Sequence, residues 1–293
     1  MDSAMETTGV STTIPGSADV NTYIPVKAGG YLALAERKAQ WVQPRHLRLL
    51  PLLHQLNLLP PATVVLGRAE NGNPLLFTPD SAGPGHLLIS GPARTGKSEL
   101  IRTVLLSLCL TGRPAQVCVL GVDLGGRELA VLDAMPHALS DLATEPGYAS
   151  ALLHWLAEEY ERRMTCTIRR PSIALVMDDL AWLDRPGCSA EAQILTDLLR
   201  SGAEAGIHIF AASLDPLPVR FCLPREDGAV VHINTFSGES GRIVVRRGSE
   251  RIHARAAWSS IHDLNTAAGL AQAGWRASRR FLMPLSASAS SHT

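Results

Sequence analysis

The middle of the chain alternates short apolar runs with longer segments whose apolar residues recur every three or four positions. The apolar runs are His86 to Ser90, Gln116 to Asp123, Ser172 to Asp178 and Ile207 to Ser213. The longer segments are Lys97 to Thr111, Tyr148 to Thr165 and Ala190 to Ala205, and their spacing predicts helices. Continuous apolar strands that alternate with helices are typical of a parallel sheet covered on both faces. The pattern therefore predicts an α/β fold.

Shorter apolar runs flank this core. Two of them, Thr63 to Leu66 and Pro74 to Phe77, are separated by the turn sequence Asn71-Gly72-Asn73 and together predict a β-hairpin. Beyond Pro224 the chain has short β-branched segments joined by glycine and serine turns. These segments are Val230 to Ile233, Arg242 to Arg247 and Arg251 to Ala257. We expect them to be added strands at the edge of the sheet.

The two ends of the chain differ from its middle. Residues 1–29 have few large apolar side chains, so burial cannot offset the entropy cost of ordering them, and we expect a disordered tail. Residues 284–293 are rich in Ser and Ala and predict a second tail. Residues 30–61 are leucine-rich, and Pro44 and Pro51 divide them into a lead-in of two or three short helices. The lead-in side chains expected on buried faces are Trp41, Leu47, Leu50 and Leu53. The main domain then covers 62–283.

Charge and cysteine content limit the possible partners and the cellular compartment only a little. Lys plus Arg and Asp plus Glu both number 27, so attraction to nucleic acid must come from local basic patches. The 5 cysteines are scattered without ligand spacing, which favours reduced thiols in a cytoplasmic protein. No apolar run approaches the roughly 20 residues that span a bilayer. We therefore expect the chain to reach a membrane only through a partner.

A glycine-rich loop lies between the first core strand and the first core helix. It matches the pattern GxxxxGK[ST], and its residues are Gly91, Pro92, Ala93, Arg94, Thr95, Gly96, Lys97 and Ser98, followed by Glu99. In this context, backbone N–H groups and the start of the helix point toward phosphate groups. Lys97 would reach the β- and γ-phosphates, and Ser98 would hold Mg²⁺. Residues 91–99 are therefore predicted to bind ATP with Mg²⁺.

Two carboxylates end the apolar run Ser172 to Asp178. The pair Asp178 and Asp179 has the Walker B form, in which acids at the end of a buried strand lie beside a phosphate loop. We predict that Asp178 orients Mg²⁺ and that Asp179 polarises the attacking water. Lys97 and Asp179 are thus the predicted catalytic residues. A plain strand that ends in a solvated turn is the alternative.

From about Thr63 to Ser213, the order of segments resembles the FtsK/HerA family of P-loop ATPases. Besides the loop and the acidic pair, the segments that carry the resemblance are Thr63 to Gly67 with the following hairpin, Val122 to His137, His154 to Met164 and Ala205 to Ser213. The most specific of them is the acidic and Arg-Arg pattern from Glu159 to Arg163. The resemblance implies a RecA-like fold and a ring of six subunits with nucleotide between neighbours. It also implies that ATP hydrolysis is coupled to movement of double-stranded DNA.

Three positions depart from that family's usual pattern. Asp179 stands where Glu is usual, and its shorter side chain withdraws the carboxylate by about one ångström. Glu204 stands where an Arg is usual, which removes a candidate arginine finger. The arginines that remain as candidate substitutes are Arg200, Arg220 and Arg225. Ser213-Leu214 replaces a Thr-Gln pair that could sense the γ-phosphate. These departures favour ATP binding over fast hydrolysis.

Arginines are densest in two stretches near the C-terminus. The stretches contain Arg242, Arg246, Arg247, Arg251 and Arg255, and then Arg276, Arg279 and Arg280. On strands, Arg242, Arg246 and Arg251 would line one face toward a DNA backbone. Solvated surface arginine is the alternative.

Two further functions stay open. Asp123 to Gly126 has the sequence Asp-Leu-Gly-Gly where chromosome translocases commonly have Asp-Pro-Lys, and this resembles the accessory ATPase modules of type VII secretion. Such a chain would be a degenerate ATP-binding module with weak hydrolysis that binds a peptide signal. A different RecA-like NTPase is the third alternative.

Overall fold

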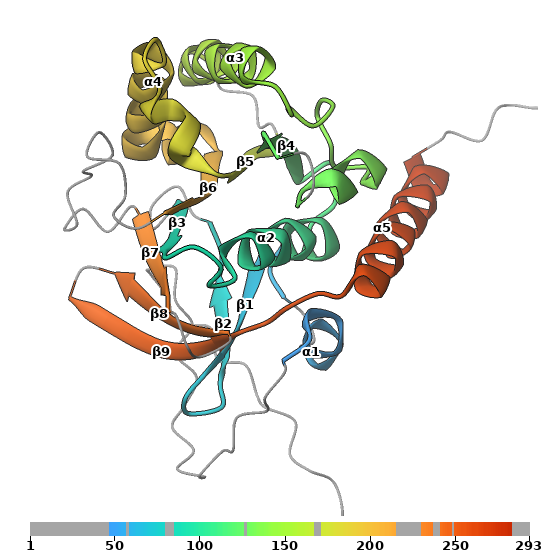
Figure 1. Cartoon of the computed structure of the whole chain (residues 1–293). Coiled ribbons are helices and arrows are strands. Elements are labelled where there is room, and N and C mark those ends of the chain that lie inside the picture. Colours follow the sequence, from blue (N-terminus) through green and yellow to red (C-terminus); the bar gives the residue numbers. More distant parts are fainter. Residues whose placement is uncertain are drawn as a thin grey trace, which may run out of the picture.

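The computed structural model describes residues 47–56, 59–79, 85–125, 128–166, 171–214, 230–236, 241–247 and 249–282. The predicted tails and the lead-in before residue 47 lie outside these residues. The described residues form a nine-stranded sheet in the order β2-β1-β9-β8-β7-β3-β6-β5-β4. Helices cover both faces of its parallel part (Figure 1). The predicted α/β class is confirmed.

One half of the sheet is parallel. Its strands, in spatial order, are β7 (Val230–Thr235), β3 (His86–Gly91), β6 (Ile207–Leu214), β5 (Ser172–Asp178) and β4 (Val117–Asp123). The four apolar runs of the core are confirmed as strands of this half. Because all of these strands run the same way, their carboxyl ends meet at one edge of the sheet, where α/β proteins usually bind ligands.

The predicted helices link these strands. α2 (Lys97–Thr111) follows β3, α3 (Pro146–Met164) follows β4, and α4 (Ser189–Ser201) follows β5. The last helix was expected to continue to Ala205, but it tightens into the 3-10 turn η3 (Gly202–Ala205), which ends at Gly206 with a left-handed φ of 69°. Figure 1 shows α2 on one face of the parallel strands and α3 with α4 on the other.

Successive residues of each parallel strand pack on opposite faces, as the two-residue repeat of a strand requires. On β3, Leu87 and Ile89 join the core beneath α2, whereas Leu88 joins the core beneath α3 and α4. On β6, Phe210 and Ile209 divide in the same way. Burial on both faces explains why these strands are apolar throughout. The packed cores on both faces also fix the positions of the carboxyl ends of the strands.

The other half of the sheet is antiparallel. Beyond β7 it continues through β8 (Arg242–Arg247), β9 (Glu250–Ala256), β1 (Val64–Ala69) and β2 (Pro74–Phe77). The hairpin of β1 and β2 is confirmed. The C-terminal strands, however, are inside the sheet and not at its edge, because the hairpin pairs with β9. Gly67 permits this pairing, since a Cβ atom there would lie 1.9 Å from the Arg255 carbonyl oxygen.

The described part of the lead-in contains α1 (Leu49–Gln55). Pro51 lies in its first turn, where a missing N–H is tolerated, and does not break it. Leu49 and Leu52 are buried, whereas Leu50 and Leu53 of the predicted set are only partly buried. The start of the helix is joined to the segment after β9, because the Leu49 N–H donates to the Trp258 carbonyl at 2.9 Å.

A long helix, α5 (Ile261–Leu282), follows β9 and was absent from the sequence-based prediction. Ser260 and Asp263 cap its start: the Asp263 N–H donates to the Ser260 hydroxyl oxygen at 3.2 Å, and the Ser260 N–H donates to the Asp263 carboxylate at 2.8 Å. Asp263 also pairs with Arg48 at 2.5 Å, which joins α1 to α5. Among the described helices none has the length and apolar character needed to cross a bilayer.

Two histidines meet in the core where β3 and β6 begin. The ring centroids of His86 and His208 are 6.4 Å apart, and both side chains are buried. The Ile209 N–H donates to Nδ1 of His86 at 3.0 Å, so Nδ1 carries no proton and the imidazole is neutral. Burial, together with the nearby His208, lowers the pKa of His86 to about 3.

We expect the free energy of unfolding to fall as the pH drops below about 6.5. The unfolded chain protonates His86 near its ordinary pKa of 6.5, whereas the folded chain does so only near 3. This contribution is therefore complete above pH ~6.5, and about 2 kcal/mol of it is lost at pH ~5. Urea unfolding at several pH values measures it. The variant His86→Asn keeps an acceptor for Ile209 and cannot titrate, so an equally steep pH dependence in that variant would refute the assignment.

Candidate nucleotide-binding site

The phosphate loop connects β3 to α2 at the carboxyl edge of the parallel strands. Arg94 and Gly96 have left-handed φ angles of 61° and 90°, and such turns direct successive N–H groups into one concavity that suits an anion. Gly91 must be glycine, because a Cβ atom there would lie 2.1 Å from the Thr235 hydroxyl oxygen. A Cβ atom at Gly96 would meet no atom within 4 Å. The loop therefore has the shape and the open space that a phosphate chain needs.

The first residues of α2 differ in what they offer. Lys97 is 9% exposed, and its ammonium donates to the Pro92 carbonyl within the loop at 2.7 Å. The Ser98 hydroxyl lies close enough to Asp178, at the end of β5, to lower the pKa of that carboxyl. The Glu99 carboxylate accepts from Arg102 and from the Ser259 N–H at 2.9 Å. Glu99 therefore has only its backbone N–H to offer a nucleotide, whereas Lys97 and Ser98 offer side chains.

Asp178 is the acid that this arrangement brings to the loop. Burial raises the pKa of Asp178 to about 6, the hydrogen bond from Ser98 opposes the rise, and repulsion by Asp123, Asp179 and Glu128 adds to it. The described residues include no group of three or more acids, histidines or cysteines that could hold a metal ion by themselves. Ser98 and Asp178 nevertheless fit Mg²⁺, because that ion commonly takes one or two protein ligands and completes its shell with phosphates and water.

Asp179 has a second task. Its carboxylate accepts the Ala181 N–H at 3.1 Å and thereby caps η2 (Leu180–Asp184). The peptide bond between Asp178 and Asp179 is cis. Asp179 thus lies next to the predicted metal ligand, with one of its oxygens engaged by the following turn. Its catalytic role stays a prediction.

The end of β7 contributes residues that the sequence did not reveal. The Asn234 side-chain amide donates to the Ser90 hydroxyl at 2.9 Å. The hydroxyls of Thr235 and Thr95 lie 2.5 Å apart, so Thr235 supports the loop from the side. The predicted strand ended at Ile233, and no local signal shows that β7 lies beside β3. This neighbourhood arises only from the strand pairing.

The end of β6 lies on the other side of the loop strand. Ser213 pairs with Ser90 and Leu214 with Gly91. Leu214 is 44% exposed and is an apolar side chain at the position where the related family usually has Gln. The departure noted in the sequence therefore lies directly beside the phosphate loop.

The motif on α3 from Glu159 to Arg163 has a structural task. Glu159 accepts from both Arg162 and Arg163. Arg163 also donates to the carbonyls of Ala205 at 3.0 Å and Pro171 at 2.9 Å. This network joins α3 to the turn after α4 and to the start of β5. It supports the strand that carries Asp178 from the end opposite the loop.

The chain matches known proteins over this part of its sequence. Residues 57–177 match the FtsK/SpoIIIE family. The DNA translocase FtsK of Tropheryma whipplei is 31% identical over 240 residues, which are 73% of this chain and 30% of that protein. The DNA translocase SftA of Bacillus subtilis is 29% identical over 177 residues, which are 53% of this chain and 18% of that protein. The chain therefore spans less than a third of the length of either relative.

Solved structures share the fold at low sequence identity. The cytoplasmic domain of the type VII secretion ATPase EccC of Thermomonospora curvata has a TM-score of 0.63 at 17% identity, covering 74% of this chain and 28% of that one. The pCW3 conjugation coupling protein TcpA has a TM-score of 0.61 at 17% identity, covering 78% of this chain and 75% of that one. At this level of identity the likenesses show that the chain shares its fold with these two proteins.

Proposed function

Because the chain is similar to the FtsK/SpoIIIE family from residue 57 to the strand that ends at Asp178, we propose that it is an ATP-driven motor for double-stranded DNA. The motor would act in DNA segregation or transfer. The observation that carries the proposal is the phosphate loop, with the Ser98 hydroxyl close enough to Asp178 to lower the pKa of that carboxyl. Relatives described as DNA translocases support the choice of cargo.

The chain's own residues would divide the work on ATP. The backbone N–H groups of residues 91–99, except Pro92, and the Lys97 ammonium would hold the phosphates, since charge-assisted hydrogen bonds are the strong ones. Ser98 and Asp178 would hold Mg²⁺, which neutralises charge on the phosphates when bound. Asp179 would orient and polarise the attacking water. Hydrolysis would then require that the cap of η2 leaves one Asp179 oxygen facing that water.

We also propose that six copies of the chain form a ring in the cytoplasm with ATP between neighbours, and that a partner would bring the ring to any membrane. An arginine from the neighbouring copy would complete the site. Arg200 on α4 is the described candidate, because its side chain is 57% exposed. Arg220 and Arg225 lie outside the described residues.

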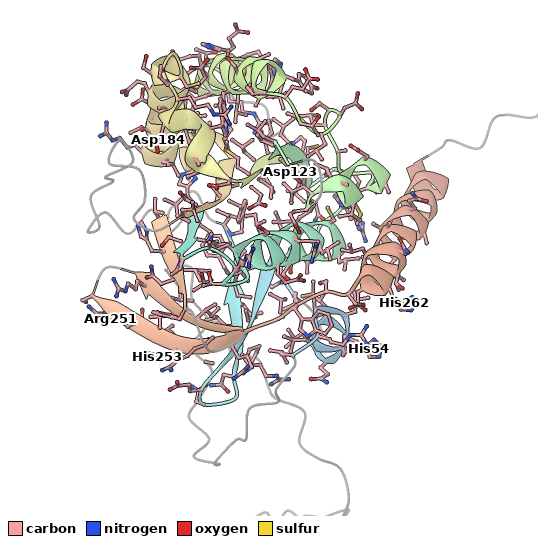
Figure 2. The ribbon with its side chains drawn as sticks, viewed as in Figure 1. His54, Asp123, Asp184, Arg251, His253 and His262 are labelled. Carbon is pink, nitrogen blue, oxygen red and sulfur yellow. The ribbon has the colours of Figure 1, made fainter. Side chains whose placement is uncertain are left out.

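The antiparallel half of the sheet is the proposed DNA face. Arg246 and Arg251 are directly opposite each other on β8 and β9, and so are Arg242 and Arg255. Directly opposite residues share a face, and like charges there repel each other unless an anion lies between them. Figure 2 shows Arg251 near the end of the hairpin that β8 and β9 form. A phosphate backbone would place negative charge between Arg246 and Arg251.

A degenerate ATP-binding module is the second candidate. Asp179 is shorter than the usual Glu and is partly engaged with Ala181, while Leu214 offers no polar group beside the loop. These observations favour slow hydrolysis. In that case a peptide and not DNA would be the partner.

The rate of ATP hydrolysis with and without duplex DNA separates the two candidates. A motor should be stimulated by DNA at low salt, and its DNA affinity should fall steeply as salt rises. The double variant Arg246→Gln/Arg251→Gln should lower the salt slope by about two, because each arginine would neutralise one phosphate group. Arg113→Gln, which removes an exposed charge after α2, is the matched control. ATP binding without stimulation by DNA would favour the degenerate module.

A further inference from the structure

The segment after β4 wraps around one buried carboxylate. Asp123 is 2% exposed, and its oxygens accept the N–H groups of Gly125 at 3.0 Å, Glu128 at 2.7 Å and Leu129 at 3.0 Å. Asp123 is also directly paired with Asp178 on the neighbouring strand. The backbone of Glu128 is thus held one strand away from the predicted metal ligand.

An arginine on the phosphate-loop helix then holds the Glu128 side chain. Arg102 donates to Glu128 at 2.8 Å through one terminal nitrogen and to Glu99 through the other. Arg102 is one helical turn after Ser98, so both residues lie on the same face of α2. The Arg102 side chain is only 16% exposed, and its Nε is buried without a hydrogen-bond partner among the described residues. The guanidinium therefore bridges the two acids from within the structure.

An arginine suits this bridge better than a lysine would. A fork of terminal nitrogens can engage two carboxylates at once, whereas a lysine ammonium acts as a point charge. Glu99 in turn accepts the Ser259 N–H just before α5. Hydrogen bonds and ion pairs therefore connect Ser259, just before α5, through Glu99 and Arg102 to Glu128. Glu99 and Arg102 lie on α2, the helix that also carries Lys97 and Ser98.

The charges around Asp178 point to what this bridge is for. Glu128 lies near enough to Asp178 to repel its negative charge, as do Asp123 and Asp179. Asp123 uses its carboxylate on three backbone N–H groups, and Asp179 caps η2. The Glu128 side chain is instead held by a cationic side chain, and it is 35% exposed. Its carboxylate is therefore fixed by Arg102 while it stays accessible to water.

We propose that Glu128 is a further residue of the Mg²⁺ site, which accepts hydrogen bonds from the water that the ion retains, and that Arg102 is the positioning residue that holds it there. This inference rests on the proposed function. Groups that hydrogen-bond to ligands of a metal orient them and contribute to affinity, and their loss commonly weakens metal binding by about 10-fold or more. The role of Glu128 concerns metal-assisted binding and needs no turnover to be detected.

Titration with a fluorescent ATP analogue, with Mg²⁺ and separately with EDTA, tests the proposal. Glu128→Gln should reduce the gain in affinity that Mg²⁺ provides by about 10-fold and leave the affinity in EDTA unchanged. Arg102→Lys should change the gain in the same direction, and the double variant should lose no more than Glu128→Gln alone, because the two residues act as one unit. Glu161→Gln, an exposed acid on α3, is the control with the same chemical change.

The outcomes separate this inference from the proposed function. A wild-type chain that binds no analogue would overturn both. A wild-type chain that binds with Mg²⁺, beside a Glu128→Gln variant with the same gain, would overturn the role of Glu128 alone. An equal loss of affinity in Mg²⁺ and in EDTA would assign the pair to the structure of the loop and likewise overturn the proposal. If Glu128→Gln fails to fold, Arg102→Lys decides by the same comparison.

Discussion

Replacement of Lys97 by alanine is expected to lower ATP turnover by more than about 100-fold, comparable to the loss of a donor that stabilises charge in a transition state. The reason is geometric. Lys97 is the first residue of α2, directly after Gly96, and its ammonium lies within the loop at 2.7 Å from the Pro92 carbonyl. Arg94, the other cation of residues 91–98, lies in the turn before the helix, where its φ is 61°.

The fold should survive this change. The hydrogen bond of the Lys97 ammonium is made to the loop itself and not to the core, and alanine is favourable in helices. Thermal unfolding and the hydrolysis rate, measured on the same sample, check both parts. Arg113→Ala, which removes an exposed cation outside the loop, should leave the rate unchanged. A Lys97→Ala chain that hydrolyses ATP at the wild-type rate would exclude Lys97 from the site.

Replacement of Glu159 by glutamine is expected to lower the free energy of unfolding by about 3 kcal/mol, the cost of breaking a buried ion pair by removing one charge. The side chains of Glu159 and Arg163 are 4% and 8% exposed. Although burial opposes ionisation, hydrogen bonds from Arg163 and Arg162 hold the pKa of Glu159 below its ordinary value. The variant would leave the Arg163 charge buried without its counter-charge.

The neighbouring Glu158 provides the control, because it is an exposed acid on the same helix. Glu158→Gln should change the free energy of unfolding by no more than about 0.5 kcal/mol. Urea unfolding followed by circular dichroism measures both variants. If both variants change the free energy of unfolding by similarly small amounts, Glu159 does not stabilise the fold. The motif from Glu159 to Arg163 would then have a role in function and not in stability.

Local signals in the sequence were enough for much of the fold. The four apolar runs of the parallel half became β3, β4, β5 and β6 because burial on both faces requires apolar residues at successive positions. The phosphate loop could be predicted because its glycines and its lysine lie within eight consecutive residues, 91–98. The start of α5 also has a local signal, since Ser260 and Asp263 have the spacing of a helix cap.

Other features depend on contacts between distant segments. Leu49 and Leu52 are fully buried, whereas Leu50 and Leu53 pack against the core only in part, and the Leu49 N–H is hydrogen-bonded to the Trp258 carbonyl. The strands β7 to β9 lie inside the sheet because the hairpin before the loop returns to pair with β9. Neither pairing leaves a mark in the local pattern, since the partners are separated by most of the chain.

The site also contains residues that local sequence predicts and residues that only tertiary contacts bring together. By itself the sequence determined which residues form the loop, Lys97 and Ser98, and which acids end the strand, because each group is encoded within a few consecutive positions. Only the tertiary structure decided that Thr235 supports the loop, that the Glu99 side chain is directed to Arg102 and Ser259, and that Glu128 comes near enough to Asp178 to repel its charge. The physical reason is that strand order and the packing of α2 bring these residues together across the sheet, and that order depends on the energy of the whole core.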